Sequence, residues 1–535
     1  MEEVQELKHL WWHEGIIYQI YPRSFQDSDG DGVGDLKGIM SRLDYLQWLG
    51  ITAIWISPIY PSPMADYGYD ISDYCAIHPL FGTMADFDAL LQEVHRRDLK
   101  LILDLVPNHT SDQHPWFLES RSSKDSPKRD WYIWEDAKED GSEPNNWLSV
   151  FGGSGWEWDE TTQQYYYHAF LKGQPDLNWR NPEVQQAMFN VMRFWLDKGV
   201  DGFRVDVMWH MIKDKHLRDN PPNPDYQEHM ATYEKLVPTF STDQPEIHEI
   251  VAKMRSVLDE YEARMMIGEI YLPIHKLVTY YGTDNNGAHL PFNFMLVNQE
   301  WDARSLLLHI NEYEGAIPPG GWPNWVIGNH DQPRITSRVG YSQAKVAAML
   351  LLTLRGTPTM YYGDEIGMRD VPIPPEEVQD PQGLNMPDKD LSRDPARTPM
   401  QWDRGEYSGF SDTKPWLRLP DNFRRVNVEV QRNDDYSMLS FYRRLIKLRQ
   451  QEPALHIGEY VPVVTKGSLL TFLRTHGDNQ FLILLNLSHR PCLFRPEHTA
   501  YSGKIVLATD PEREGKQVAN NISMSGDEGI VVQLS

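Results

Sequence analysis

The chain has 535 residues with 51 basic and 77 acidic side chains, so its formal net charge is −26 at pH 7. This excess of negative charge argues against nucleic acids and anionic membranes as partners, because both would repel the protein. Hydrophobic residues make up 40% of the sequence, enough to fill the core of one large domain or of several smaller ones.

The two cysteines, Cys75 and Cys492, are far apart in the sequence. They form neither a disulfide framework nor a metal-binding spacing, which favours a reducing compartment. The first seven residues lack the basic start and apolar core of a signal peptide, and no run reaches the ~18 apolar residues of a membrane span. We therefore expect a cytoplasmic protein without a membrane anchor, either a monomer or a small homo-oligomer.

Eight short apolar runs recur over the first two-thirds of the chain, and amphipathic helical patterns separate most of them. The runs are continuous rather than alternating, as in strands that are covered on both faces. They span residues 16–21, 53–57, 101–106, 202–207, 265–270, 290–294, 325–329 and 358–362. Eight such strands alternating with helices predict an α/β fold, a parallel (β/α)8 TIM barrel.

Three further stretches do not fit this alternation. Residues 105–174, rich in Trp, Asp, Ser and Gly, are too long for one helical crossover and predict a small domain inserted after the third strand. The barrel would then comprise 1–104 and 175–455, with the proline-rich stretch 369–403 as a long loop at its active site. From about residue 456 to 535, short alternating runs predict a C-terminal antiparallel β-sandwich domain.

Polar side chains end several of the predicted strands. Arg204 and Asp206 are two residues apart, so in a strand they share one face, where the arginine would hold the carboxylate ionised. Glu269 ends the next run and Asp331 ends a later one. Because the carboxyl ends of barrel strands meet at one rim, we expect these three acids to converge on an active site.

Taken together, the motifs resemble the α-amylase superfamily, glycoside hydrolase family 13. The similar segments are DLVPNH (104–109), QPDLN (174–178), GFRVDV (202–207), GEIY (268–271) and NHD (329–331). Three more segments resemble its oligo-1,6-glucosidase and α-glucosidase branch: residues 18–39, GTPTMYYGDEIGM (356–368) and ARTPMQW (396–402). The resemblance extends from residue 11 to about residue 455.

The resemblance implies a retaining, exo-acting α-glucosidase that releases α-glucose from the non-reducing end of short α-glucosides, with no organic cofactor. Asp206 would be the nucleophile, Glu269 the general acid/base and Asp331 a third carboxylate that binds sugar hydroxyls. We expect Glu269 to titrate well above Asp206, because the acid must keep its proton at neutral pH. The resemblance further implies a set of sugar-binding residues: Asp66, Tyr69, His109, Arg204, His330 and Arg397. We also expect Phe170 and Trp209 to contact the leaving group.

Within this set, Asp66 and Arg397 would close the pocket behind the terminal glucose, which makes endo action less favoured than exo action. Val207 follows the predicted nucleophile, and in this branch a valine there tends to accompany α-1,6 cleavage. Met208–His210 and the short proline-rich loop depart from the 1,6-cleaving pattern, which leaves maltose-type, sucrose and trehalose substrates open.

Two other functional classes share the scaffold. A transglucosylase or sucrose isomerase would keep every catalytic residue and differ in how well the leaving-group site excludes water. Non-catalytic transporter heavy chains also resemble this barrel, but they carry a membrane anchor and have lost catalytic acids, whereas this chain retains Asp206, Glu269 and Asp331.

One acidic loop predicts a metal site. Residues 27–35 place carboxylates at positions 1, 3, 5 and 9 and a glycine at position 6, as in the first part of an EF-hand loop. Gly38 stands where the bidentate glutamate is expected. The resemblance implies a structural Ca²⁺, or Mg²⁺, in this loop. The candidate ligands are Asp27, Asp29, Asp31, the Val33 carbonyl and Asp35.

Overall fold

The computed structural model describes residues 10–463, 467–496 and 500–535. The first seven residues, from which the absence of a signal peptide is predicted, lie outside this part. None of the helices in the described part is long and apolar enough to cross a membrane. Cys75 and Cys492 are free and half-buried.

The eight predicted strands form a closed, fully parallel barrel, which confirms the predicted fold class. Nearly every residue of these strands is buried, as expected where side chains fill the interior and helices cover the outside. The strands are β1 (Ile17–Ile20), β2 (Ala53–Ile56), β3 (Lys100–Leu105), β7 (Gly202–Val205), β8 (Met265–Ile270), β9 (Leu290–Asn293), β10 (Asn324–Val326) and β11 (Thr357–Tyr361).

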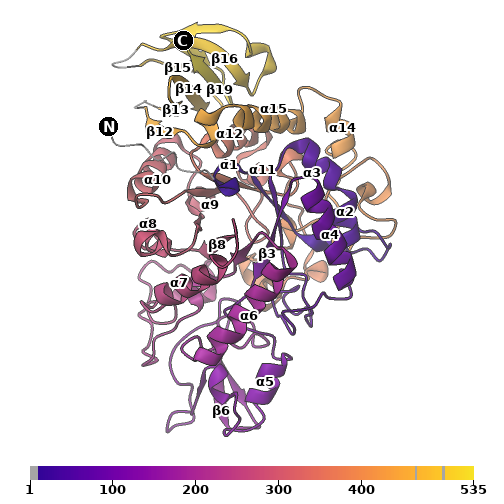
Figure 1. The fold of residues 1–535 in the computed structure, drawn as a ribbon, viewed down its shortest axis with the longest axis vertical. Helices are drawn as coiled ribbons and strands as arrows, with labels where there is room; N and C mark the ends of the chain where they lie inside the picture. Colours follow the sequence, from indigo (N-terminus) through magenta and orange to yellow (C-terminus); the bar gives the residue numbers. More distant parts are fainter. Residues whose placement is uncertain (1–9, 464–466, 497–499) are drawn as a thin grey trace.

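Helices on the outer surface begin and end where local chemistry dictates. In α6 (Pro182–Lys198), the Asn181 side chain accepts the backbone N–H of Glu183, and Pro182 occupies the first turn, where its missing N–H is not needed. The helix ends at Gly199, whose φ of 105° favours glycine. This helix connects β6 of the inserted region to β7, and so delivers the chain to the strand that precedes Asp206 (Figure 1).

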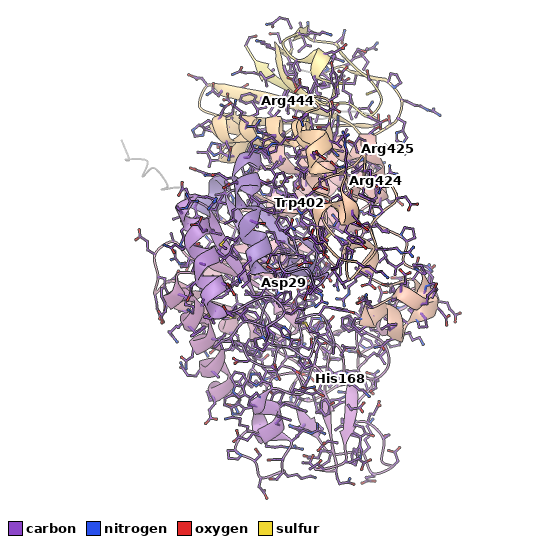
Figure 2. All side chains as sticks on the ribbon, turned by 90° about the vertical axis from the view of Figure 1, so that its right-hand side faces the viewer. Asp29, His168, Trp402, Arg424, Arg425 and Arg444 are labelled. Carbon is purple, nitrogen blue, oxygen red and sulfur yellow. The ribbon has the colours of Figure 1, made fainter. Side chains whose placement is uncertain are left out.

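The inserted region carries a three-stranded antiparallel sheet in the order β4 (Trp134–Glu135), β6 (Gln164–Tyr167), β5 (Trp156–Asp159). Its small core is built from packed aromatic rings: Trp147 stacks on Trp156, and Tyr167 meets both at steeper angles. In Figure 1, α5 (Pro115–Ser120) and β6 lie at one end of the molecule and the C-terminal sheet lies at the other. Figure 2 gives the same arrangement from the side, with His168 near one end and Arg444 near the other.

The C-terminal region holds a six-stranded sheet in the order β12-β13-β14-β19-β16-β17 and a two-stranded sheet, β15-β18. One face of the large sheet packs on the small sheet, and the other face joins the main core beside α12 (Tyr341–Thr353) and α15 (Met438–Gln451). The two layers of this sandwich are therefore unequal, because barrel helices do part of the covering. The strands are β12 (Glu459–Pro462), β13 (Leu469–His476), β14 (Asn479–Asn486), β15 (Cys492–Phe494), β16 (Ser502–Ala508), β17 (Gln517–Ala519), β18 (Ile522–Met524) and β19 (Gly529–Leu534).

Two fully buried arginines join this sheet to the barrel. Arg449, on α15, donates to the carbonyls of Leu352, Leu354, Leu455 and Gly356. Arg474, on β13, donates to the carbonyls of residues 353, 455, 458 and 459. Three of these carbonyls belong to residues 352–354, at the end of α12, where helix carbonyls have no intrahelical partner.

Candidate active site

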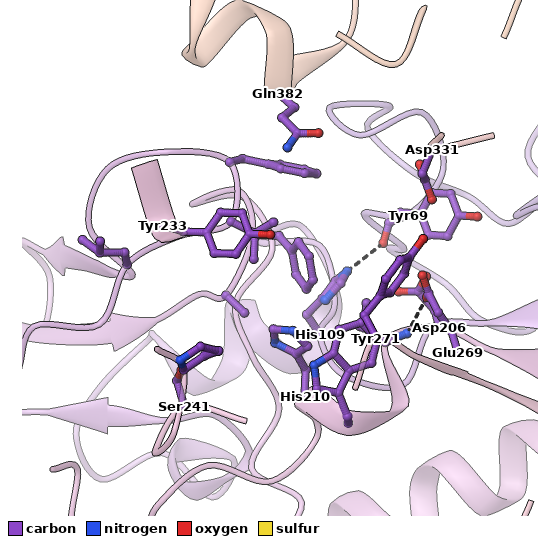
Figure 3. Close-up of a pocket in the computed structure, with 18 of the residues that line it drawn as sticks. Tyr69, His109, Asp206, His210, Tyr233, Ser241, Glu269, Tyr271, Asp331 and Gln382 are labelled. Carbon is purple, nitrogen blue, oxygen red and sulfur yellow. Dashed lines mark hydrogen bonds between the residues drawn. The ribbon is translucent and has the colours of Figure 1, made fainter. Parts of the chain in front are cut away.

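The three predicted acids come together in one cavity at the carboxyl ends of the barrel strands. Asp206 directly follows β7, Glu269 lies near the end of β8, and Asp331 follows β10. All three line a cavity of about 590 Å³. Figure 3 shows Asp206 and Glu269 side by side, with Asp331 above them.

Arg204, on β7, is fully buried and contacts three carboxylates. Its Nη1 lies 2.9 Å from Asp104 Oδ1 and 2.7 Å from Asp206 Oδ1, and its Nη2 lies 2.6 Å from Glu269 Oε2. One guanidinium thus fixes both central acids of the site. The predicted support of Asp206 by Arg204 is present, and Asp104, the first residue of the DLVPNH motif, is an additional partner.

Burial and mutual repulsion perturb these acids. Burial raises the pKa of Asp206 well above that of an ordinary aspartate, and it also raises the pKa of Glu269; Arg204 opposes both shifts. The pKa of Asp104 rises to about 6 for the same reason. Because both central acids shift upward, these directions do not order the two, and the titration of Glu269 above Asp206 stays a prediction.

Val207 adopts a backbone conformation that is unusual for a β-branched residue. Its φ of 36° lies in the left-handed region, which costs a β-branched residue on the order of 1–3 kcal/mol. In this conformation its backbone N–H donates to Glu269 Oε2 at 2.8 Å. The residue that follows the predicted nucleophile therefore also holds the predicted acid, through its main chain.

His330 lies beneath Asp331, in a ring of polar contacts. Its Nδ1 is 2.7 Å from the Gln19 amide, and its Nε2 is 2.8 Å from the Tyr69 hydroxyl and 3.2 Å from Asp331 Oδ2. Burial lowers its pKa well below the usual value, so the imidazole is neutral. Since the Gln19 amide donates to Nδ1, the single ring proton sits on Nε2 and faces Asp331.

His109 and Tyr69 form the neighbouring wall. His109 Nε2 lies 3.2 Å from the Tyr69 carbonyl, and burial lowers the pKa of this histidine to about 4. The Tyr69 ring stacks on His330 with an interplanar angle of 4°. The amide of Gln174, from the QPDLN motif, reaches both His109 Nε2 and Asp66 Oδ2, so this motif supports the wall.

The arginine that pairs with Asp66 is not the one predicted. Arg393, not Arg397, pairs with Asp66, at 2.8 Å, and lines the cavity. Arg397 lies deeper, where it donates to the His330 carbonyl and, at 2.7 Å, to Asp331 Oδ1. The two arginines are four residues apart in one segment, so the motif alone did not decide which of them faces the sugar.

The predicted leaving-group residues, Phe170 and Trp209, both line the cavity. Phe170 packs against His109 and Phe151, and Trp209 packs against Tyr271. Sequence reasoning missed several other lining residues: Phe151, His210, Tyr233, Tyr271, Gln382 and Arg393. Tyr271 ends the GEIY motif and His210 closely follows the GFRVDV motif, so the sequence could have indicated both. The other four depend on how loops fold over the rim; Figure 3 shows Tyr233 and Gln382 at the pocket.

The acidic loop partly gathers its predicted ligands. Carboxylate oxygens of Asp27, Asp29 and Asp35 lie within 4.8 Å of one another. Asp31 is not part of this group; one of its oxygens accepts the Val33 N–H instead. The donor set is made of hard oxygens and therefore fits Ca²⁺ or Mg²⁺. Asp35 also caps α2 (Leu36–Ser41), so the loop is tied to a barrel helix.

A closed parallel barrel with two buried carboxyls held together at its C-terminal rim is the arrangement of a glycoside hydrolase. Residues 19–458 match the family model described as the α-amylase catalytic domain. The chain is 43% identical over 502 residues to a probable α-glucosidase of Rhizobium meliloti (strain 1021), covering 89% of each chain. It is 40% identical over 568 residues to an oligo-1,6-glucosidase of Parageobacillus thermoglucosidasius, covering 99% and 100%. The chain belongs to the α-amylase family.

Solved structures agree with this assignment. An α-glucosyl transfer enzyme superposes with a TM-score of 0.93 at 39% identity, covering 99% of this chain and 100% of that one. The trehalulose synthase MutB from Pseudomonas mesoacidophila MX-45 superposes with a TM-score of 0.91 at 34% identity, covering 98% and 100%.

Proposed function

We propose that this glycoside hydrolase is a retaining, exo-acting α-glucosidase that removes glucose from the non-reducing end of short α-glucosides, with a preference for α-1,6 linkages. One observation carries the proposal: two buried carboxyls share the Arg204 guanidinium and face a pocket whose far wall is an Asp66–Arg393 ion pair. Retaining enzymes need two carboxyls about 5–5.5 Å apart. Asp206 and Glu269 bind neighbouring nitrogens of the same guanidinium, which favours a separation of this size.

In the first step, Asp206 attacks C1 of the bound glucose. Its Oδ1 is engaged by Arg204, so Oδ2 is the attacking oxygen. Glu269 gives its proton to the leaving oxygen as the C1–O bond breaks. Because Glu269 Oε2 already accepts from Val207 and contacts Arg204, the proton sits on Oε1. The products are a glucosyl ester on Asp206 and the released alcohol.

In the second step, a water molecule enters from the leaving-group side. The ionised Glu269 takes one proton from this water. The water oxygen bonds to C1 as the bond between C1 and Asp206 breaks. Two inversions at C1 return the α configuration. Asp331, fixed by Arg397 and by the His330 Nε2–H, is placed to bind sugar hydroxyls. Burial alone would raise its pKa, but these contacts and Arg393 hold the pKa well below the usual range.

The Asp66–Arg393 ion pair at the far wall of the pocket accounts for the proposed exo action. With Arg393 paired to Asp66 and resting over the Phe151 ring, no second sugar fits behind the terminal glucose. The leaning to α-1,6 linkages rests on Val207, on the leaving-group side, and on relatives named oligo-1,6-glucosidase. One methyl-scale contact discriminates by only ~1–3 kcal/mol, so the α-1,4 linkage is the competing substrate.

The test is a proton-NMR time course on an equimolar mixture of isomaltose and maltose. We expect faster loss of isomaltose, with α-glucose as the first anomer to appear. Faster loss of maltose would contradict the linkage preference, and first release of β-glucose would contradict the retaining mechanism. If neither sugar changes, the proposed function itself is wrong.

A second candidate is supported by the solved structures, which include an α-glucosyl transfer enzyme and a trehalulose synthase. In a transglucosylase or sucrose isomerase, a sugar hydroxyl rather than water would attack the glucosyl ester. The same NMR experiment with sucrose separates the two, because an isomerase forms a new disaccharide without an equal amount of free glucose.

We further propose that the acidic loop binds a structural Ca²⁺ or Mg²⁺ through Asp27, Asp29 and Asp35. Asp31 and the Val33 carbonyl also belong to the predicted ligand set, and Asp31 would have to turn toward the other three carboxylates to join them. The ion would stabilise the loop and take no part in the reaction.

A further inference from the structure

The arginine that closes the pocket is itself held by a carboxylate outside the pocket. Asp380 accepts three hydrogen bonds from Arg393: from its backbone N at 2.7 Å, from Nε at 2.9 Å and from Nη2 at 2.6 Å. Asp380 is fully buried and does not line the cavity. It therefore contacts the sugar site only through Arg393.

The backbone of Asp380 is fixed in turn. The backbone N–H groups of Gln379 and Asp380 both donate to Asp394 Oδ2, at 2.7 and 3.0 Å. Residues 379–380 and residues 393–394 of the same loop are thus joined by two buried carboxylates, Asp380 in the first segment and Asp394 in the second. The result is a rigid clamp that orients the Arg393 fork toward the sugar.

On its sugar-facing side, Arg393 is held less firmly. It makes one contact with Asp66 at 2.8 Å and one with Asp331 Oδ1 at 3.2 Å. Asp331 keeps a shorter partner, Arg397 at 2.7 Å. Release of Arg393 would therefore disturb Asp66 and the far wall much more than it would disturb Asp331.

We propose that Asp380 is a positioning residue that sets the exo-specificity of the enzyme by holding Arg393 across the end of the glucose pocket. This inference rests on the proposed α-glucosidase function. Without the Asp380 carboxylate, Arg393 keeps its contacts with Asp66, Asp331 and the Phe151 ring but loses its shortest ion pair, and is free to leave the wall. Terminal glucose would then bind less tightly, and a further sugar would gain room behind it.

The test compares Asp380→Asn with Glu377→Gln. Glu377 lies in the same loop and pairs with Arg418, also at 2.9 Å, but both side chains are more than two-fifths exposed and neither lines the cavity. The substrates are isomaltose, maltose and a maltoheptaoside whose non-reducing glucose is blocked at O4 and O6. Wild-type enzyme must first cleave isomaltose or maltose; if it cleaves neither, the proposed function fails and not this inference.

For Asp380→Asn we expect KM for the disaccharides to rise about 10- to 100-fold while kcat falls less than about fivefold, since buried charge pairs contribute at this scale and Asp331 keeps Arg397. We also expect new internal cleavage of the blocked maltoheptaoside, which wild type and Glu377→Gln leave intact. A general loss of structure would lower kcat and would not create that activity. Unchanged KM together with no cleavage of the blocked substrate would overturn the proposal.

If Asp380→Asn does not fold, Asp394→Asn replaces it, because that change loosens the clamp while the Asp380 carboxylate stays. We expect a smaller rise in KM and detectable cleavage of the blocked substrate. A folded Asp394→Asn enzyme with wild-type KM and strict exo action would overturn the proposal.

Discussion

Buried arginines serve opposite purposes at the two ends of the barrel. At the catalytic rim, Arg204 meets three carboxylates, which raise its pKa well above the usual value. At the junction with the C-terminal sheet, the side-chain hydrogen bonds described for Arg449 and Arg474 all go to backbone carbonyls. There burial lowers the pKa of Arg449 to about 9 and that of Arg474 well below its usual range.

The difference shows what each region needs. The rim needs carboxylates held in a fixed orientation, and the shared guanidinium provides this while it opposes the upward pKa shifts that burial causes. The junction needs to satisfy backbone carbonyls at helix ends, and the planar fork of arginine reaches several of them at once. Substitutions at the rim should therefore affect chemistry, and substitutions at the junction should affect stability.

The largest expected effect is at the rim. Asp206→Asn removes the attacking oxygen, so kcat should fall by more than about 10⁴-fold, the scale seen when a nucleophile is lost. The apparent Tm should stay the same or rise, because a buried acid of high pKa is replaced by a neutral amide. Initial rates on isomaltose and a thermal melt test both points. Activity within 100-fold of wild type would refute the assignment.

The reverse pattern is expected at the junction. Arg474→Met removes the donor to four backbone carbonyls, of which, among the described contacts, only that of Leu455 keeps a second arginine donor, Arg449. The free energy of unfolding should fall by about 2–4 kcal/mol, less than the sum of the lost bonds because a buried charge is also removed. The kcat of the folded enzyme should not change. Arg425→Met, at an exposed arginine marked in Figure 2, is the matched control. An unchanged Tm for Arg474→Met would break the comparison.

The acidic loop brings carboxylates together with no arginine ion pair among its described contacts. Removing divalent ions with EDTA should lower the apparent Tm, and excess Ca²⁺ should restore it. At a Ca²⁺ concentration of 100 times Kd, the free energy of unfolding should rise by about 2.7 kcal/mol. Asp29→Asn should abolish this response while kcat remains near that of wild type. Thermal melts with and without Ca²⁺ measure the effect. A melt that is indifferent to EDTA and Ca²⁺ would rule out a stabilising ion.

The pocket wall should respond to pH. Burial raises the pKa of Asp66 to about 6, so this carboxylate is charged above pH 6 and neutral below it. As pH falls from 7 to 5, Asp66 loses its charge and its pairing with Arg393 weakens, so KM should rise by about tenfold. In Asp66→Asn, KM should be high at both pH values. A wild-type KM that is constant between pH 5 and 7 would contradict this role.

The smallest effect is expected at Val207. Val207→Thr keeps the β-branch and adds a hydroxyl on the leaving-group side, so the ratio of kcat/KM for isomaltose to that for maltose should fall by about 5- to 100-fold. The strained backbone and its hydrogen bond to Glu269 should persist, so total activity should change little. Initial rates on the two disaccharides give the ratio. An unchanged ratio would remove Val207 as the source of linkage preference.

Sequence patterns predicted the barrel and its three acids because each depends on local order: a continuous apolar run, then a polar residue at its end. They did not distinguish Arg393 from Arg397, because that choice depends on how residues 369–403 fold over the rim. The left-handed backbone of Val207 was also not predictable, since β-branched residues disfavour it. Nor could the sequence reveal that Arg449 and Arg474 face carbonyls, because carbonyl positions are set by the tertiary fold.

The ion pair between Asp66 and Arg393 also has a kinetic consequence. It blocks the inner end of the pocket, so substrate, leaving group, water and product all pass through the same outer opening. The leaving group must depart before water can reach the glucosyl ester, and glucose is the last molecule to leave. Glucose should therefore compete directly with substrate for the free enzyme, and the sugar that the enzyme releases would slow its own production as it accumulates.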